Sequence, residues 1–120
     1  MSRIPFLIAG LVTMLVLAAT SAGMSDVTKL TGTTGPGFTI TLKKGSATVK
    51  TLKAGKYTIT VNDKSKTHNF RLKGPGLNKE ITGVAFVGTK TVTVMLKKGT
   101  YTYQCDPHLA AGMKGTFKVT

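Results

Sequence analysis

Apolar and polar residues alternate through most of the chain from Phe38 onward. The alternating segments read FTITL, YTITV, HNFRL, TVTVML, YTYQC and TFKV, and they begin at residues 38, 57, 68, 91, 101 and 116. In FTITL, for example, Phe38, Ile40 and Leu42 alternate with threonines. A period of two, combined with many β-branched and aromatic residues, predicts half-buried β-strands.

Turn-forming sequences separate these segments. They read GPG, KKGS, KAGK, NDKS, KGPG and KKGT, and most contain glycine. No ten-residue stretch after residue 22 shows helical periodicity. Short strands at regular spacing with such turns predict an all-β fold, an antiparallel sandwich or barrel of about seven to eight strands.

The N-terminal residues have a different pattern. Arg3 precedes an apolar run at residues 6–19, and the small residues of AATSAG follow it. This order is typical of a secretory signal peptide, and we expect cleavage after Ala22. The apolar run is short for a membrane span, which takes about 20 residues, so an uncleaved membrane anchor is the less favoured alternative.

These patterns divide the chain into three parts. We predict a cleaved signal peptide at 1–22, a short N-terminal lead or edge strand at 23–34, and one folded domain at 35–120. If the lead contains a strand, it lies near Val27 to Leu30. The signal peptide predicts an exported protein, located in the periplasm, on the outer face of the cell membrane or outside the cell.

The composition is strongly basic. The chain has 17 Lys and Arg against four Asp and Glu, a formal charge of +13, and Arg3 of the predicted signal peptide contributes one of these charges. The lysines are scattered around the predicted turns, so a solvated surface is the simplest explanation for them. Their combined field favours acidic protein faces or an anionic membrane or cell-wall surface. We expect no nucleic-acid partner, because the protein is predicted to be exported and has no aromatic-rich basic RNA-binding motif.

The residues with metal-binding chemistry concentrate in YQCDPHLAAGMKG, residues 103–115. This stretch holds the only cysteine, one of the two histidines and a methionine. A single cysteine cannot form an internal disulfide, and in an exported protein it is kept for chemistry or for pairing with another chain. Strand alternation places Cys105 on the inward face with Tyr101 and Tyr103, and it places His68 on the apolar face of another strand.

Four residues form a candidate ligand set: His68, Cys105, His108 and Met113. Pro107 must end the strand after Cys105, so residues 108–113 are predicted to form a loop between two strands. A thiolate, two imidazoles and a weak thioether are the donors of blue-copper sites. Each residue taken alone also has an ordinary explanation, such as a small buried cysteine or a packing methionine.

The spacing C-x₂-H-x₄-M in CDPHLAAGM, the preceding strand YTYQC and the upstream HN resemble the small blue-copper proteins of the cupredoxin family, the plastocyanin type in particular. The resemblance covers roughly residues 38 to 120. It implies a Greek-key sandwich, one type 1 copper ion per chain, and a soluble, monomeric one-electron carrier that is not an enzyme.

The resemblance also implies a role for each site residue. His68, Cys105 and His108 would be the equatorial copper ligands, and Met113 the axial one. Asn69 would tie the two ligand loops together and donate towards the cysteine sulfur. His108 would be the partly exposed ligand through which electrons pass.

A docking surface is implied around His108. Its apolar rim would consist of Pro107, Leu109, Ala110, Ala111 and Gly112, and Pro107 would also support the ligand loop. The glycine–proline turns at Gly35 and Gly74 would lie nearby.

The basic charge departs from the acidic face that is common among plastocyanins of oxygenic photosynthesis. We therefore expect the redox donor and acceptor proteins to present acidic docking faces. Two other functions stay open: an extracytoplasmic copper carrier that uses the same ligands, and a metal-free basic sandwich that binds anionic surfaces. A larger copper enzyme is not expected, because a trinuclear cluster needs many more histidines than two.

Overall fold

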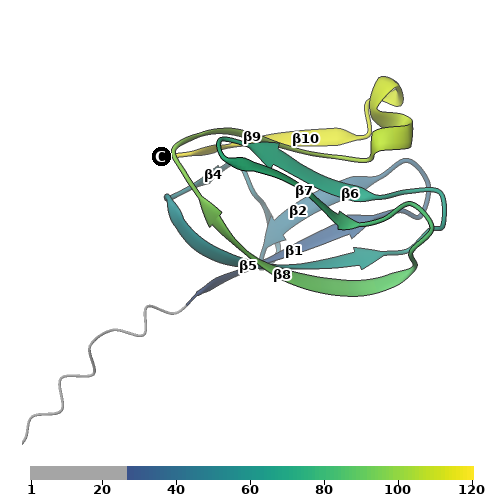
Figure 1. Ribbon diagram of the computed structural model, residues 1–120, viewed down its shortest axis with the longest axis horizontal. Coiled ribbons are helices and arrows are strands. Elements are labelled where there is room, and N and C mark those ends of the chain that lie inside the picture. The colour runs from purple at the N-terminus through teal and green to yellow at the C-terminus, as the bar shows by residue number, and fades with distance from the viewer. Residues whose placement is uncertain (1–26) are drawn as a thin grey trace, which may run out of the picture.

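The computed structural model describes residues 27–120, so the signal peptide predicted at 1–22 lies outside the described residues. Two five-stranded sheets face each other (Figure 1). The first has the order β3-β2-β1-β5-β8, with β1 (Thr28–Thr34), β2 (Ile40–Lys44), β3 (Ala47–Thr48), β5 (Gly55–Asp63) and β8 (Gly88–Leu96). The second has the order β4-β10-β9-β6-β7, with β4 (Thr51–Leu52), β6 (Phe70–Gly74), β7 (Leu77–Thr82), β9 (Gly99–Gln104) and β10 (Lys114–Val119).

The predicted all-β sandwich is confirmed, with more strands than the pattern indicated. Two of the ten, β3 and β4, have only two residues each. A third, β7, has the sequence LNKEIT, and three consecutive exposed polar residues hide its alternation. Most strand pairs are antiparallel as predicted, but β1 pairs with β5 and β4 with β10 in parallel.

The prediction of a lead or edge strand at 23–34 is wrong for its second half. β1 runs through Thr34 and lies between β2 and β5, in the middle of its sheet. The folded domain therefore begins before residue 35. The sequence TKLTGTT has only one large apolar residue, Leu30, so the alternation that marks the other strands is weak here. Hydrogen bonds to β2 on one side and to β5 on the other hold β1 in the sheet despite its weak sequence pattern.

The core lies between the sheets and is built from the inward residues of the alternating segments. Ile59, Val61 and Leu72 are fully buried. The rings of Tyr101 and Phe117 stack with centroids 5.4 Å apart. Burying each large apolar side chain contributes about 1.5–3 kcal/mol. These residues therefore supply most of the free energy that holds the two sheets together.

The alternation in FTITL predicts a half-buried strand that includes Phe38, and this is wrong at Phe38. β2 begins only at Ile40. Leu42 is fully buried, whereas Phe38 is 67% exposed. The turn that precedes β2 carries the phenyl ring to the end of the sandwich.

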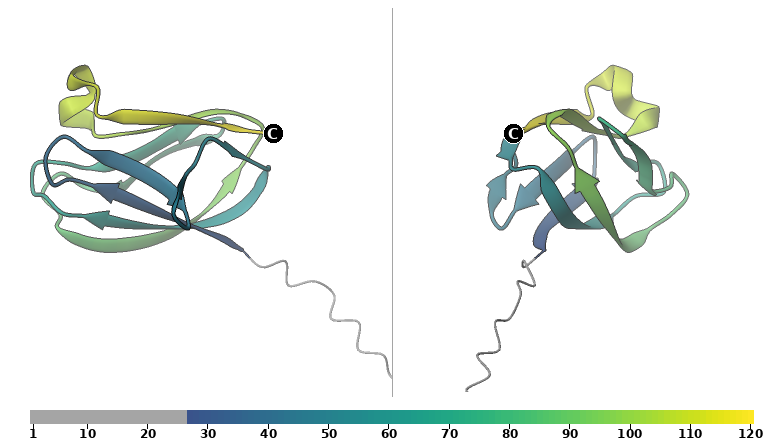
Figure 2. Two further views of the ribbon diagram at one scale, coloured as in Figure 1. Left: turned by 180° about the vertical axis from the view of Figure 1, so that it is seen from behind. Right: turned by 60° about the vertical axis from the view of Figure 1, so that its left-hand side comes forward.

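The two ends of the sandwich are built differently. Loops 35–39, 64–69, 83–87 and 105–113 gather at one end, which we call the Cys105 end. A short 3₁₀ helix, Asp106–Ala111, projects from it in every view (Figures 1 and 2). The turns 53–54, 75–76 and 97–98, the start of β1 and the C-terminal residue Thr120 lie at the other, distal end. No helix within residues 27–120 is long and apolar enough to cross a membrane.

Candidate metal centre

His68 lies in the loop that joins β5 to β6, at the Cys105 end. Its backbone N–H donates to the carbonyl of Ser65 at 3.4 Å, and its side chain is buried, with 4% exposed. Gly35 packs against the ring: a Cβ built there would stand 3.1 Å from His68 Cδ2. Gly35 also has φ of +75°, a conformation that glycine adopts without a steric penalty. The loop sequence thus favours a close approach to the imidazole.

Cys105 follows the last residue of β9 and is fully buried. Its N–H donates to the carbonyl of Met113 at 3.0 Å, which continues the pairing of β9 with β10 across the base of the ligand loop. The inward orientation of Tyr101, Tyr103 and Cys105 that alternation predicted is confirmed by their burial.

The segment after Cys105 was predicted as a loop, and most of it is a short 3₁₀ helix. Pro107 is in its first turn, where a missing N–H costs nothing. The helix ends at Gly112, which has φ of +83° and N–H donation back to Leu109. His108 N–H donates to Cys105 O, and Met113 N–H donates to His108 O, both at 3.2 Å. These backbone bonds bring the cysteine, histidine and methionine of C-x₂-H-x₄-M close together in space.

Three donor atoms converge at this point. His68 Nδ1 and His108 Nδ1 are 3.0 Å apart, and Cys105 Sγ lies 3.6 Å from the first and 3.4 Å from the second. Donors that share one metal at about 2.0–2.3 Å stand roughly 3.5 Å apart, so the triangle fits a single ion. Two imidazoles and a thiolate around one ion are the trigonal donor set of blue copper.

Met113 completes the cluster. It is 1% exposed, and its backbone bonds to both Cys105 and His108. Met113 and Cys105 are buried, but neither belongs to the contiguous apolar core formed by the other buried hydrophobic residues. The four predicted ligand residues are therefore gathered at the Cys105 end, in an arrangement consistent with one type 1 copper ion.

Asn69 connects the two ligand loops through Asp106. Its Oδ1 accepts a bond from the Asp106 backbone N–H at 2.7 Å, and its Nδ2 donates to Asp106 Oδ2 at 2.8 Å. The Thr34 hydroxyl holds the Asn69 carbonyl from β1 at 3.2 Å. The loop that contains His68 is thereby tied to the residue that follows Cys105. This linkage agrees with the expectation for Asn69.

The other expectation for Asn69, donation towards the cysteine sulfur, does not hold among residues 27–120. The polar contacts of Cys105 Sγ there are with His68 and His108. The second bond of Asn69 Nδ2 goes instead to Glu80 Oε2 at 3.0 Å. A carboxylate is the stronger acceptor, and β7 brings Glu80 within reach.

A charged network extends from Asp106 over the second sheet. Arg71 Nε donates to Asp106 Oδ2 at 2.8 Å, and Arg71 Nη2 donates to Glu80 Oε2 at 3.2 Å. Gln104 Nε2 donates to Asp106 Oδ1 at 2.9 Å. Partial burial raises the pKa of Asp106, but the bonds from Gln104, Arg71 and Asn69 and the charge of Arg71 outweigh it and hold the pKa below its usual value. No local sequence pattern predicts this network.

The predicted docking residues lie on the surface next to His108. Pro107, Leu109, Ala110, Ala111 and Gly112 are exposed, and His108 itself is partly exposed. Phe38 was not predicted as part of this surface, yet its ring meets His108 edge to face with centroids 4.7 Å apart. Phe38 lies in a turn, and the sequence around it does not predict a contact with His108.

The two glycine–proline turns lie at opposite ends. Gly35 is at the Cys105 end beside His68, as expected. Gly74 closes β6 at the distal end, where Tyr101 Oη donates to Pro75 O at 3.0 Å. The expectation that Gly74 lies near the ligand loop is wrong, because β6 runs away from the site.

Comparisons with known proteins agree with this geometry. Residues 46–120 match the family described as "Copper binding proteins, plastocyanin/azurin family". Among solved structures, the copper protein rusticyanin is similar, with 23% identity over 77% of this chain and 76% of that chain and a TM-score of 0.58. A structure of rusticyanin from Thiobacillus ferrooxidans gives 24% identity, coverage of 77% and 76%, and a TM-score of 0.54. At this identity the likeness demonstrates a shared cupredoxin-like fold.

Proposed function

The chain belongs to the plastocyanin/azurin family of copper-binding proteins, and from that premise we propose that it is a one-electron carrier and not an enzyme. The observation that carries the proposal is the convergence of His68 Nδ1, His108 Nδ1 and Cys105 Sγ within 3.0–3.6 Å of one another. Copper bound there supplies a Cu(II)/Cu(I) couple.

The protein's own part is to hold the donors in one geometry for both oxidation states. A thiolate favours Cu(I), and imidazoles suit both states. Cys105 is fixed by its bond to Met113 O and His108 by its bond to Cys105 O. Asn69 and Asp106 join the His68 loop to the same segment. Few atoms then need to move when the charge changes, which is what fast electron exchange requires.

His108 is the group through which we propose that electrons enter and leave. Its ring is partly exposed, whereas His68 and Cys105 are buried. Phe38 and the exposed apolar residues after Pro107 surround it. A partner that docks on this rim comes closer to the metal through His108 than through any other ligand of the three.

We further propose that the protein is exported and acts as a monomer, with donor and acceptor proteins that present acidic faces. The support is the predicted signal peptide and the formal charge of +13. Complementary charge raises association rates at low salt, and the effect is lost as salt is added. Electron-transfer rates that fall with ionic strength would agree with this choice of partner.

The test is a titration of the purified protein with Cu(II), with Cys105 kept reduced and with optical and EPR spectra recorded. We expect an intense visible thiolate-to-copper band, a narrow copper hyperfine splitting and saturation at one copper per chain. Ascorbate should bleach the band, and Cys105→Ser should never show it. If Met113→Leu loses the visible band, Met113 is essential for the copper site. If the variant keeps the band but has a shifted reduction potential, Met113 is the weak axial ligand.

The rival function is a copper carrier with the same ligands. A carrier would pass Cu(I) rapidly to a competing chelator, and its voltammetry would be slow or irreversible. An electron carrier shows a reversible one-electron wave and retains copper through repeated cycles. Weak spectra typical of copper on surface histidines would contradict both functions. They would favour the metal-free alternative, in which the basic surface binds an anionic partner.

A further inference from the structure

Charge is divided unequally between the two ends of the sandwich. The acidic residues within 27–120 are Asp63, Glu80 and Asp106, and all three are at the Cys105 end. Asp63 closes β5 opposite Thr34. Glu80 and Asp106 both accept bonds from Asn69. The Asp and Glu side chains of the described residues therefore all lie at the end that holds the metal centre, although the protein as a whole is basic.

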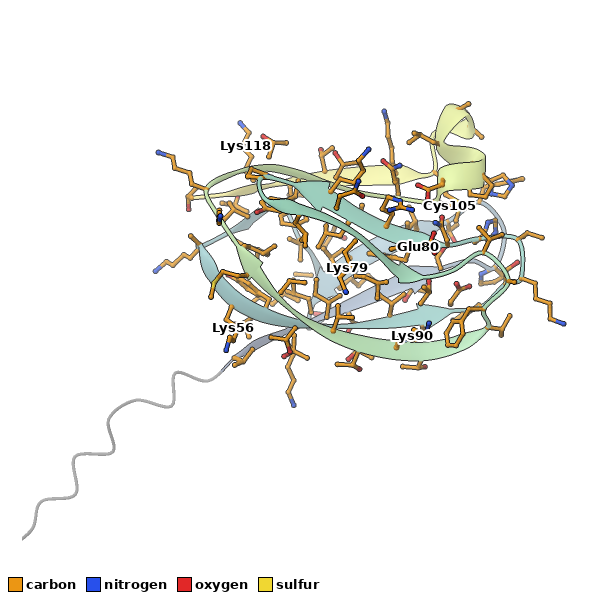
Figure 3. The ribbon with its side chains drawn as sticks, viewed as in Figure 1. Lys56, Lys79, Glu80, Lys90, Cys105 and Lys118 are labelled. Atoms are coloured by element: carbon orange, nitrogen blue, oxygen red, sulfur yellow. The ribbon has the colours of Figure 1, made fainter. Side chains whose placement is uncertain are left out.

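The distal end carries lysines without Asp or Glu neighbours in the described chain. The exposed lysines there include Lys44, Lys53, Lys56, Lys97, Lys98 and Lys118. Figure 3 shows Lys56 and Lys118 at the opposite end of the sandwich from Cys105. No salt bridge within residues 27–120 involves any of these six, because both ion pairs there use Arg71. Their charges are available to a partner.

A hollow of about 760 Å³ opens among these lysines. Lys44, Lys53 and Lys56 line it, together with Val27 and Tyr57. Val27 is 39% exposed. Met95 is 56% exposed and pairs with Lys56 in register across β5 and β8, so the two side chains stand on the same face. The distal end thus combines ammonium groups with exposed apolar side chains.

We propose that the distal end binds the surface of an anionic phospholipid bilayer. Lysines next to exposed apolar residues suit a headgroup layer, in which phosphates lie just above acyl chains. A purely polyanionic partner would have no use for Val27 and Met95. β1 enters the sandwich at this end, with Thr28 opposite Tyr57.

Binding through the distal end would orient the protein on the bilayer, with the Cys105 end pointing away from the lipid. β5 has nine residues, so the two ends are separated by roughly 30 Å at about 3.3 Å per residue. This exceeds the Debye length of about 8–10 Å at physiological salt. Lysines at the Cys105 end therefore contribute little to bilayer attraction. Bound by its distal end, the protein holds His108 away from the lipid, where a soluble partner can reach it. Bilayer binding itself does not depend on copper.

Two variants with equal charge change test the proposal. The distal variant replaces Lys44, Lys53 and Lys56 by Gln, and the control variant replaces Lys64, Lys66 and Lys90, which lie towards the Cys105 end, by Gln. All six lysines are exposed, so both variants should fold, which circular dichroism verifies. All proteins carry the same N-terminus. Binding is measured by co-sedimentation with vesicles of phosphatidylcholine alone and of phosphatidylcholine with phosphatidylglycerol at roughly three to one.

The wild type should bind the anionic vesicles and not the neutral ones. The distal variant should partition roughly a hundredfold more weakly, and the control variant should lose less than roughly threefold. Lysine acylation followed by mass spectrometry gives a second readout: anionic vesicles should protect Lys53 and Lys56 and leave Lys64 and Lys66 reactive.

Several results would overturn the proposal. Equal losses in the two variants would mean that net charge alone attracts the protein. If neither variant lost affinity for the anionic vesicles, the N-terminal residues would be responsible for the binding. Binding of soluble polyphosphate through the same lysines, without binding of the vesicles, would assign the distal end to an anionic polymer.

Discussion

Arg71 Nε donates to Asp106 Oδ2 at 2.8 Å, so a residue of β6 holds the residue that directly follows the buried Cys105. The same guanidinium reaches Glu80 on β7. The ligand segment is thus attached to the second sheet by a side-chain contact in addition to the strand pairing of β9 with β10. This attachment does not require a metal ion, and its strength can be measured in the metal-free protein.

Arg71→Ala should lower the free energy of unfolding of the metal-free protein by about 1 kcal/mol, because Arg71 and Asp106 are partly exposed and Asp106 keeps its other donors. For a domain of this size that corresponds to a fall of about 4–8 °C in Tm. Arg71→Lys keeps the charge but not the fork of donors and should fall in between. Thermal unfolding followed by circular dichroism measures the effect. An unchanged Tm in Arg71→Ala would show that the contact contributes nothing to stability.

Asn69→Ala should cost more, about 2–3 kcal/mol, because Asn69 is fully buried and the Asp106 N–H loses its acceptor. Asn78 provides the matched control, since its side chain also belongs to the Arg71 network but is exposed and accepts only from Arg71 Nη1. Asn78→Ala should change the free energy by less than about 0.5 kcal/mol. Urea unfolding of both variants measures the difference. Equal costs would refute the assigned role of Asn69.

Phe38→Ala should leave stability nearly unchanged, because the ring is 67% exposed. It should nevertheless uncover His108, whose ring the phenyl edge meets at a centroid distance of 4.7 Å. We expect copper loss to a competing chelator to become several-fold faster. Val87→Ala is the control, because it truncates another exposed hydrophobic side chain at the same end, 50% exposed against 67% for Phe38. If both variants lose copper at the wild-type rate, Phe38 does not shield the site.

Gly35→Ala and Gly37→Ala separate backbone strain from crowding of His68. The two glycines have similar φ values, +75° and +69°, so alanine carries a similar penalty of about 1–2 kcal/mol at each. Only at Gly35 would the new Cβ press on His68, at 3.1 Å, since Gly37 has nothing within 4 Å. Gly35→Ala should therefore weaken copper binding as well as stability, and Gly37→Ala stability alone. Copper titration and chemical denaturation of the same preparations measure both quantities.

Sequence pattern sufficed where the information is local. The spacing of Cys105, His108 and Met113 needs only one turn of helix and one strand pair to close on a point, so the motif itself encodes most of the geometry. The inward positions of Tyr101 and Tyr103 followed from alternation in the same way. His68 was placed correctly because its neighbours Phe70 and Leu72 carry the same pattern.

The remaining features depend on pairing between distant segments. β1 looks like a weak strand because TKLTGTT is polar, and only the presence of β2 and β5 on its two sides makes it central. Phe38 has the residue type of a core position, yet β2 starts two residues later and leaves the ring outside. Asp106 and Arg71 are 35 positions apart and meet only because β6 pairs with β9.

The ligand set also has an order in time. His68 precedes β6, whereas Cys105, His108 and Met113 all come after β9, and β10 follows them. A chain made from its N-terminus forward therefore contains all five strands of the first sheet, the last ending at Leu96, before it can offer three donors to one ion. Metal acquisition must then be among the last events in the maturation of each molecule. The ion has to come from the compartment in which the polypeptide finishes folding, whatever supply exists where its synthesis begins.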